Sequence, residues 1–200
     1  ESLTALLALS SAILHLRARG ADSAVPRILS VACFALALLC KSVAVVLPAL
    51  LLAADWAAGR SWRRAWPAYV PYAAVLAAYL LVVRTYLHRA VAGEPVRSLV
   101  TQLGTQTKAA VHYARLLVMP VDLNVHHVFH ESAWSPAVAA ALALLVSLAC
   151  LAWAFRRRCP LLVLAGAWVT VPLVPTALVP LNILVNDHRP YLSLVGLGLV

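Results

Sequence analysis

The sequence predicts an all-α fold, a polytopic bundle of transmembrane helices, and two observations carry this prediction. Of the 200 residues, 64% are hydrophobic and 12% are charged, whereas a soluble domain is typically about half apolar and a quarter charged. Several apolar runs also approach the roughly 20 residues that a helix needs to cross a bilayer. We therefore expect an integral, multi-pass membrane protein that is surrounded by membrane lipid and forms a single domain over residues 1–200.

The apolar runs divide the chain into about seven predicted spans, of which the first and the last are truncated. The spans are 2–16, 28–40, 42–57, 66–83, 136–154, 161–180 and 188–200. Several prolines lie in or near them, where kinks are tolerable because neighbouring groups satisfy the freed carbonyls. These prolines are Pro67, Pro71, Pro172, Pro175 and Pro180. The chain begins without Met and stops inside an apolar run, so we expect an internal segment of a longer protein.

Three short connectors rich in arginine set the predicted orientation. They contain Arg17, Arg19 and Arg27, then Arg60, Arg63 and Arg64, then Arg156, Arg157 and Arg158. Basic residues gather in cytoplasmic loops, so we place all three connectors inside and the N-terminus outside. Lys41, the long segment 84–135 and residues 187–189 then lie on the extracytoplasmic side.

Residues 28–57 allow two interpretations. One long helix would leave Lys41 near the bilayer centre and would put the arginine connectors on different sides. Two short helices that turn at Lys41 would keep the connectors on one side. Total charge counts do not separate these alternatives, but short, dense connectors carry most of the orientation signal. We therefore favour two helices.

The segment from Ser98 to Met119 differs from the spans, because its polar and basic residues recur at steps of four and three. They are Thr101, Thr105, Lys108, His112 and Arg115. Such spacing stacks side chains on one helical face, and Leu99, Leu103, Ala110, Ala114 and Leu117 fall on the other side. We expect a basic amphipathic helix at the outer membrane interface, ended by Pro120.

The last fifteen residues place an acid, an imidazole and a guanidinium side by side between two apolar runs, at Asp187, His188 and Arg189. Placing such groups beside hydrocarbon costs several kcal/mol unless they are paired or face a wet cavity. Groups of this kind usually line a site or a pathway. This seam is the first candidate functional region.

Three segments, in this order, resemble GT-C type glycosyltransferases that use polyprenyl-phosphate sugars. The first is Leu39 to Pro48 with the later Ala54-Asp55-Trp56, similar to a Ser/Cys-Lys-Glu run with downstream Pro and Asp-Trp. The second is His112 to Leu123, similar to Tyr-x-Arg-Leu-Leu-x-x-Pro. The third is Asn186 to Leu192, similar to Glu-His-Arg-x-Tyr-Leu-Pro-Ser-x-Gly. The closest resemblance is to the transmembrane and tetratricopeptide-repeat proteins linked to protein O-mannosylation.

The sequence departs from the family pattern at Ser42 and Asp187, which stand where the family has Glu, and at Ser193-Leu194, which replace Pro-Ser. The resemblance implies a GT-C-like core without its first outer loop and without the C-terminal repeat domain. The catalytic acid of the family lies in that first loop, so we expect it upstream of Glu1 and assign no catalytic residue here.

The resemblance implies transfer of a hexose such as mannose from a polyprenyl-phosphate carrier to a hydroxyl of a protein or glycan acceptor. Such a reaction needs a base for the hydroxyl and cations for the departing phosphate. The candidate donor-phosphate residues are Lys41, Arg189, Lys108 and Arg115, and the candidate supporting residues are Asp187, His188 and Tyr191. All of them fall on the predicted extracytoplasmic side.

Simpler interpretations stay open for each of these groups. Asp187 and Arg189 could form a structural ion pair, Lys41 could snorkel to the interface, and the basic helix face could bind anionic headgroups. The alternative function is non-enzymatic, namely a lipid-carrier transporter or a membrane scaffold for a repeat domain.

The sequence requires no cofactor, and we predict no metal site. His126, His127, His130 and Glu131 could suggest a metal, but they fall in a predicted loop without the order of a known zinc motif. The four cysteines lack CxxC spacing, which indicates neither a zinc site nor a disulfide framework. No basic motif with interleaved aromatic residues is present, so nucleic acid is not an expected partner.

Overall fold

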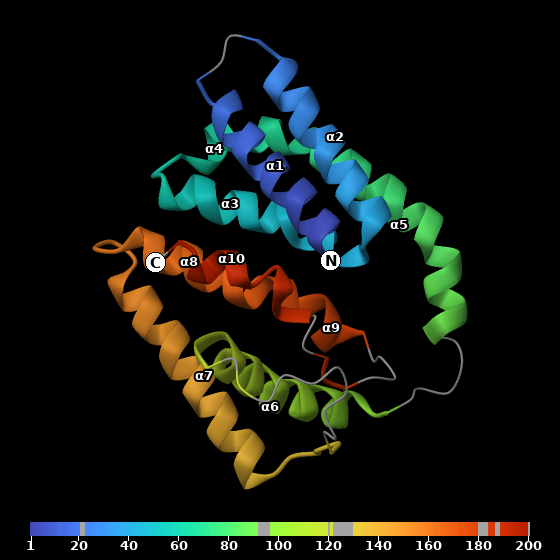
Figure 1. Cartoon of the computed structure of the whole chain (residues 1–200), viewed down its shortest axis with the longest axis vertical. Coiled ribbons are helices and arrows are strands. Elements are labelled where there is room, and N and C mark those ends of the chain that lie inside the picture. The colour runs from blue at the N-terminus through green and yellow to red at the C-terminus, as the bar shows by residue number, and fades with distance from the viewer. Residues whose placement is uncertain are drawn as a thin grey trace. The chain divides into compact units, whose positions relative to one another are not determined.

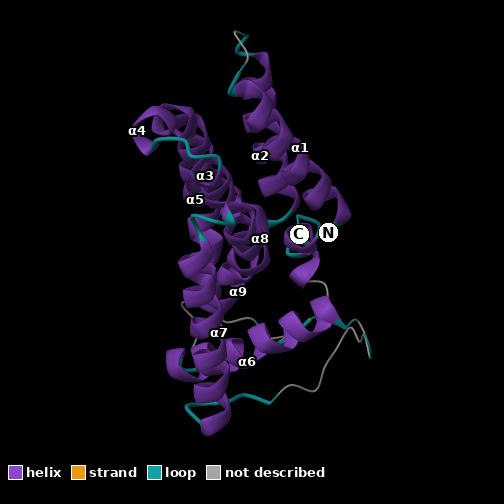
Figure 2. Ribbon diagram, turned by 90° about the vertical axis from the view of Figure 1, so that its left-hand side faces the viewer, coloured by secondary structure: helices purple, strands orange, loops and turns teal. Residues whose placement is uncertain are grey.

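The computed structural model describes residues 1–20, 23–91, 97–119, 121, 130–179, 184–186 and 189–199. The chain forms two compact units, Glu1–Ala92 and Gly93–Val200, which we call unit 1 and unit 2 (Figure 1). Every regular element of these described ranges is helical (Figure 2). The predicted all-helical fold class is therefore confirmed.

Side chains from four helices form the core of unit 1. Its elements are α1 (Ser2–Ala18), α2 (Val25–Cys40), the 3₁₀ helix η1 (Ser42–Val46), α3 (Leu47–Ala57), α4 (Trp62–Ala65), the 3₁₀ helix η2 (Trp66–Tyr69) and α5 (Val70–Val91). The chain reverses between α1 and α2, which lie side by side, and α5 also contacts α2 (Figures 1 and 2). The four helices that form the core are α1, α2, α3 and α5, and their buried side chains include Phe34, Leu47, Leu50 and Tyr72.

The helical run breaks at Lys41. The backbone of Lys41 is extended (φ −160°, ψ 136°), and its N–H caps α2 by donating to the carbonyl of Ala37. The chain continues through η1 into α3, which begins with Pro48 in its first turn, a position where proline is favoured because no N–H is needed. Residues 28–57 therefore form two helices, as the favoured interpretation predicted.

Unit 2 contains the elements α6 (Leu99–Val118), α7 (Pro136–Phe155), α8 (Pro160–Thr170), η3 (Val171–Leu173), α9 (Val174–Leu178), η4 (Arg189–Tyr191) and α10 (Leu194–Leu197). Helix α6 packs against α7, and α10 packs along α8. The α10 contact is close at Gly196, where a Cβ atom would lie 2.5 Å from the carbonyl oxygen of Ala165. Only glycine allows this approach of the two backbones.

Three segments of the described chain are long and apolar enough to cross a membrane, namely Trp66–Arg84, Pro136–Phe155 and Pro160–Leu178. They coincide with the predicted spans 66–83, 136–154 and 161–180. The chain bends there into 3₁₀ turns that contain Pro67 and Pro172, as expected for residues without an N–H. The helical runs Ser2–Ala18, Val25–Cys40 and Ser42–Ala57 are apolar but shorter.

The predicted span 188–200 differs from the structure. Its described residues form only the three-residue η4 and the four-residue α10, rather than one continuous helix. Pro190 cannot donate a helical hydrogen bond, and Gly196 and Gly198 lower helix propensity. Apolar composition alone made this segment look like a span.

Candidate functional site in unit 2

Helix α6 turns a polar face into the interior of unit 2. Ser98 caps the helix by accepting a hydrogen bond from the N–H of Thr101, a preferred role for serine. Gln102, Thr105 and Gln106 are buried, whereas Leu99 and Leu103 are exposed. The predicted helix is present, but its buried side is polar, and its interfacial location stays a prediction.

The buried glutamines find partners in backbone carbonyls. Gln102 Nε2 donates to the carbonyl of Thr176 (3.1 Å) within α9, and Gln106 Nε2 donates to the carbonyl of Leu184 (3.3 Å). Buried amides are stable only when they are hydrogen-bonded. These bonds therefore hold α9 and the backbone at Leu184 against α6.

From here on the seam means the described residues 184–186 and 189–191, of which residues 184–186 lie along the same face of α6. Val185 is 1% exposed and joins Ala109, Tyr113 and Leu116 in a hydrophobic cluster. The N–H of Asn186 donates to Tyr113 Oη (3.1 Å), and Arg189 Nη1 donates to the carbonyl of Leu184 (2.7 Å). The second and third segments of the family resemblance thus meet in space.

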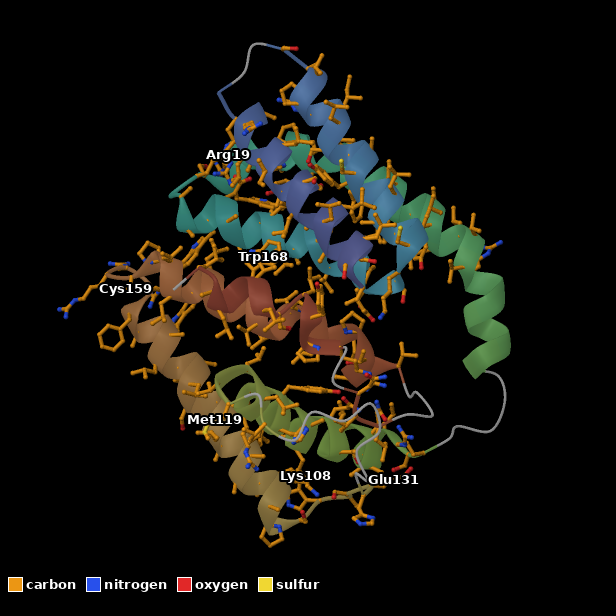
Figure 3. The ribbon with its side chains drawn as sticks, in the orientation of Figure 1. Arg19, Lys108, Met119, Glu131, Cys159 and Trp168 are labelled. Atoms are coloured by element: carbon orange, nitrogen blue, oxygen red, sulfur yellow. The ribbon has the colours of Figure 1, made fainter. Side chains whose placement is uncertain are left out.

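A second segment, residues 130–133, covers the basic side of α6. Lys108 Nζ donates to Ser132 Oγ (2.7 Å), and the N–H of Ser132 donates to Thr105 Oγ1 (2.9 Å). A Cβ atom on Gly104 would lie 2.5 Å from the Ser132 carbonyl oxygen, so glycine permits this contact. Figure 3 shows Lys108 on α6 and Glu131 on the neighbouring segment.

Arg97 anchors the start of α6 to these surroundings. Its side chain is 3% exposed and donates from Nε to Glu131 Oε1 (3.1 Å) and from Nη1 to Gln102 Oε1 (2.7 Å). Gln102 therefore links Arg97 to the carbonyl of Thr176. Sequence patterns give no signal for this role of Arg97, because its partners are up to 34 residues away in the chain.

An apolar cavity of about 370 Å³ lies beside the polar face. Its walls come from α6, α7, α8, η3 and α9 and include Leu103, Ala110, Leu117, Leu148, Val169 and Leu173. Gln106 and Tyr113 also line it, and both contact the seam at Leu184 and Asn186. The cavity and the seam therefore share a wall.

The predicted donor-phosphate residues are divided between the two units. Lys108 and Arg189 lie in unit 2, on α6 and on the seam that packs against it. Arg115 is exposed in the last turn of α6. Lys41 belongs to unit 1, where it forms an ion pair with Glu1.

Of the three candidate supporting residues, only Tyr191 is among the described residues. It lies in η4 and is 39% exposed. Asp187 and His188 lie outside the described residues, and so do His126 and His127. His130 is exposed, and the described partner of Glu131 is Arg97.

Unit 1 contains a buried charged cluster centred on Asp55. This residue lies in the last turn of α3 and is 2% exposed. Its Oδ1 atom pairs with Arg19, and its Oδ2 atom accepts from Tyr69 Oη (2.6 Å) and lies 3.4 Å from His15 Nε2. Arg60 lies 3.7 Å from Oδ1.

Further hydrogen bonds extend this cluster into the helix packing. His15 Nδ1 lies 3.2 Å from Tyr72 Oη, which is 2.6 Å from Ser30 Oγ, and Ser11 Oγ donates to the Ser30 carbonyl (2.8 Å). His15 and Ser11 lie four residues apart on α1, so they share one face. That spacing indicates a polar face on α1, but it does not identify Asp55 as the partner of His15.

Comparison of the chain with protein-family models, with curated proteins and with solved structures found no match.

Proposed function

We propose that the chain is part of a multi-pass membrane glycosyltransferase of the GT-C type. It would transfer a hexose such as mannose from a polyprenyl-phosphate carrier to a hydroxyl of a protein or glycan. The observation that carries the proposal is the shared wall in unit 2, where Gln106 and Tyr113 contact both the apolar cavity and the seam that holds Arg189.

A polyprenyl-phosphate sugar is amphiphilic, and the unit 2 site has matching chemistry. The apolar cavity would take part of the hydrocarbon chain, because its lining side chains are mostly aliphatic. The side chains of Arg189 and Gln106 both donate to the carbonyl oxygen of Leu184. Because Gln106 also lines the cavity, Arg189 lies near the cavity wall and would approach the phosphate of a donor bound there. A guanidinium suits a phosphate because it offers several donors in a planar fork.

In this reaction the bond between the sugar C1 atom and the phosphate oxygen breaks, and a bond from C1 to the acceptor oxygen forms. The hydroxyl proton passes to a base, which the family resemblance puts upstream of Glu1. The leaving group is the polyprenyl phosphate. Cations near its oxygens would stabilise the charge that develops as the bond breaks.

The test measures donor binding and sugar transfer separately, with the full-length protein in liposomes. Arg189→Ala should weaken binding of polyprenyl phosphate about tenfold, as expected for a lost charge-assisted hydrogen bond, and should slow transfer of labelled sugar. Arg157→Ala, which removes an exposed arginine between α7 and α8, is the matched control. Unchanged donor binding in Arg189→Ala would refute the phosphate role.

The wild-type protein decides between the two function classes. Transfer of labelled sugar from the polyprenyl-phosphate donor supports the enzyme. Folded protein that binds the donor but transfers no sugar, with any acceptor, supports the lipid-carrier transporter or scaffold instead.

A further inference from the structure

Two of the arginine connectors meet at one carboxylate in unit 1. Arg19 follows α1, and Arg60 lies between α3 and α4, yet both guanidinium groups face Oδ1 of Asp55. Figure 3 labels Arg19 at the C-terminal end of α1. Connectors that are 41 positions apart in the sequence thus form one end of unit 1, which we call the arginine end.

Positive charge exceeds negative charge at the arginine end. Arg17, Arg19, Arg60 and Arg63 belong to the connectors and their flanking turns, and Asp55 lies among them. The other described carboxylate of unit 1, Glu1, lies at the opposite end of α1, about 25 Å away at 1.5 Å per residue.

Asp55 does not accept hydrogen bonds from all the N–H donors of the two guanidinium groups. Arg60 Nη1 lies 3.7 Å from Oδ1, which is beyond hydrogen-bond distance, and its side chain makes no hydrogen bond to the described residues. Arg19 Nε is buried and also lacks a hydrogen-bond partner among them. Both side chains are partly exposed, at 21% and 30%. An anion at this place could accept hydrogen bonds from Arg60 and from the exposed part of the Arg19 guanidinium.

The rim of the arginine end is apolar and aromatic. Trp62 and Trp66 are 61% and 52% exposed, and the Trp62 ring stacks on Tyr69, the residue that bonds to Asp55. Val70, at the start of α5, is half exposed. Tryptophan favours the headgroup level of a bilayer, and basic pockets between helices bind lipid phosphates. A soluble anion would make no use of this rim.

We propose that Arg19 and Arg60 form a binding site for the phosphodiester headgroup of an anionic phospholipid at the arginine end of unit 1. Asp55 orients Arg19 for the phosphate, while the exposed tryptophans contact the glycerol backbone and the upper acyl chains. The proposal rests on the membrane location proposed above but not on the transfer reaction, and the residues are separate from the unit 2 site.

The test counts bound phosphatidylglycerol by native mass spectrometry. The full-length protein is reconstituted in nanodiscs of phosphatidylcholine that contain a minority of phosphatidylglycerol, and is then released from them. Arg60→Gln should reduce retained phosphatidylglycerol about tenfold, because one charge-assisted contact to the phosphate is lost. Arg157→Gln, which removes the same charge from an exposed arginine of unit 2, should reduce it much less.

Equal retention in Arg60→Gln and Arg157→Gln would overturn the proposal, because diffuse attraction treats the two arginines alike. Displacement of the lipid by inorganic phosphate would also overturn it, since the site would then accept a free anion. If Arg60→Gln does not fold, Arg60→Lys replaces it. A lysine keeps the charge but loses the planar fork, so intermediate retention is expected, and wild-type retention would count against the site.

Sugar transfer is not part of this measurement. If the wild-type protein transfers no sugar but Arg60→Gln lowers its retention of phosphatidylglycerol as expected, the proposed function alone is refuted. Normal transfer with equal retention in the two glutamine variants would refute the lipid site alone.

Discussion

Unit 1 satisfies a buried carboxylate with charged and phenolic side chains from its other helices, whereas unit 2 satisfies buried amides with backbone carbonyls. Asp55 contacts Arg19, His15 and Tyr69. In unit 2, Gln102 and Gln106 donate to the carbonyls of Thr176 and Leu184. The first arrangement joins helices by their side chains, and the second holds α9 and the backbone at Leu184 against α6.

This difference has a physical consequence for the two proposed sites. Substitutions in a charged cluster are strongly destabilising, because removal of one partner leaves an uncompensated charge in a poorly solvated place. Neutral amide bonds are weaker individually, and each loss costs less. Unit 2 therefore tolerates a non-helical seam beside a cavity, while unit 1 depends on one carboxylate.

The largest expected effect is the loss of Asp55. Asp55→Ala removes the common partner of Arg19, His15 and Tyr69 and should destabilise the protein by ~3–5 kcal/mol, the usual cost of breaking a buried ion pair. Thermal unfolding in detergent, followed by tryptophan fluorescence, measures the change.

The control for this prediction is the carboxylate–arginine pair of unit 2. Glu131→Ala breaks the bond to the buried Arg97, but Glu131 is 48% exposed and Arg97 keeps its bond to Gln102, so a smaller loss of about 2 kcal/mol is expected, as for one hydrogen bond to a charged group. Equal losses of stability in Asp55→Ala and Glu131→Ala would show that the two ion pairs contribute equally, which would contradict the proposed difference between unit 1 and unit 2.

The next effect concerns backbone packing in unit 2. Gly196→Ala would place a Cβ atom 2.5 Å from the Ala165 carbonyl oxygen and 2.9 Å from the Val169 nitrogen. Neither backbone atom can move easily, so we expect a loss of ~1–3 kcal/mol in the same unfolding measurement.

Gly166 provides a matched control on α8 itself. A Cβ atom at Gly166 meets nothing within 4 Å, so Gly166→Ala should stabilise the helix by ~0.5–1 kcal/mol through lower unfolded-state entropy. The same sign of change in both glycine variants would contradict the close contact between α10 and α8.

The sequence predicted those features that depend on local composition. The spans 66–83, 136–154 and 161–180 are long apolar runs, and the break at Lys41 was favoured because it keeps the short arginine connectors on one side of the membrane. Helix α6 was predicted because polar and basic residues recur at steps of four and three between Ser98 and Met119. The structure places the helix between the same limits.

The features that the sequence could not predict depend on how helices pack. The contact of Asp55 with His15 joins residues 40 positions apart, and no periodicity reports such a distance. Gln102 and Gln106 lie outside the polar face that the spacing predicts for α6, and both are buried. Their partners are backbone carbonyls, which every residue carries, so sequence patterns give no signal for them.

The smallest expected effect compares one buried tyrosine hydroxyl in each unit. Tyr72→Phe removes the hydroxyl that lies between Ser30 and His15, and Tyr113→Phe removes the acceptor for the N–H of Asn186. Each change should cost ~1 kcal/mol, the net value of a typical hydrogen bond, because both rings keep their packing.

Hydrogen exchange of the Asn186 amide then separates the two variants. Tyr113→Phe should speed that exchange several-fold, because the amide loses a partner that holds the seam on α6, whereas Tyr72→Phe should leave it unchanged. If Tyr113→Phe does not alter exchange at Asn186, the seam is held by Arg189, Gln106 and the packing of Val185, and Tyr113 acts only as a core side chain. In that case the shared wall of the proposed donor site rests on Gln106, so a Gln106→Leu variant, rather than Tyr113→Phe, should weaken the binding of polyprenyl phosphate.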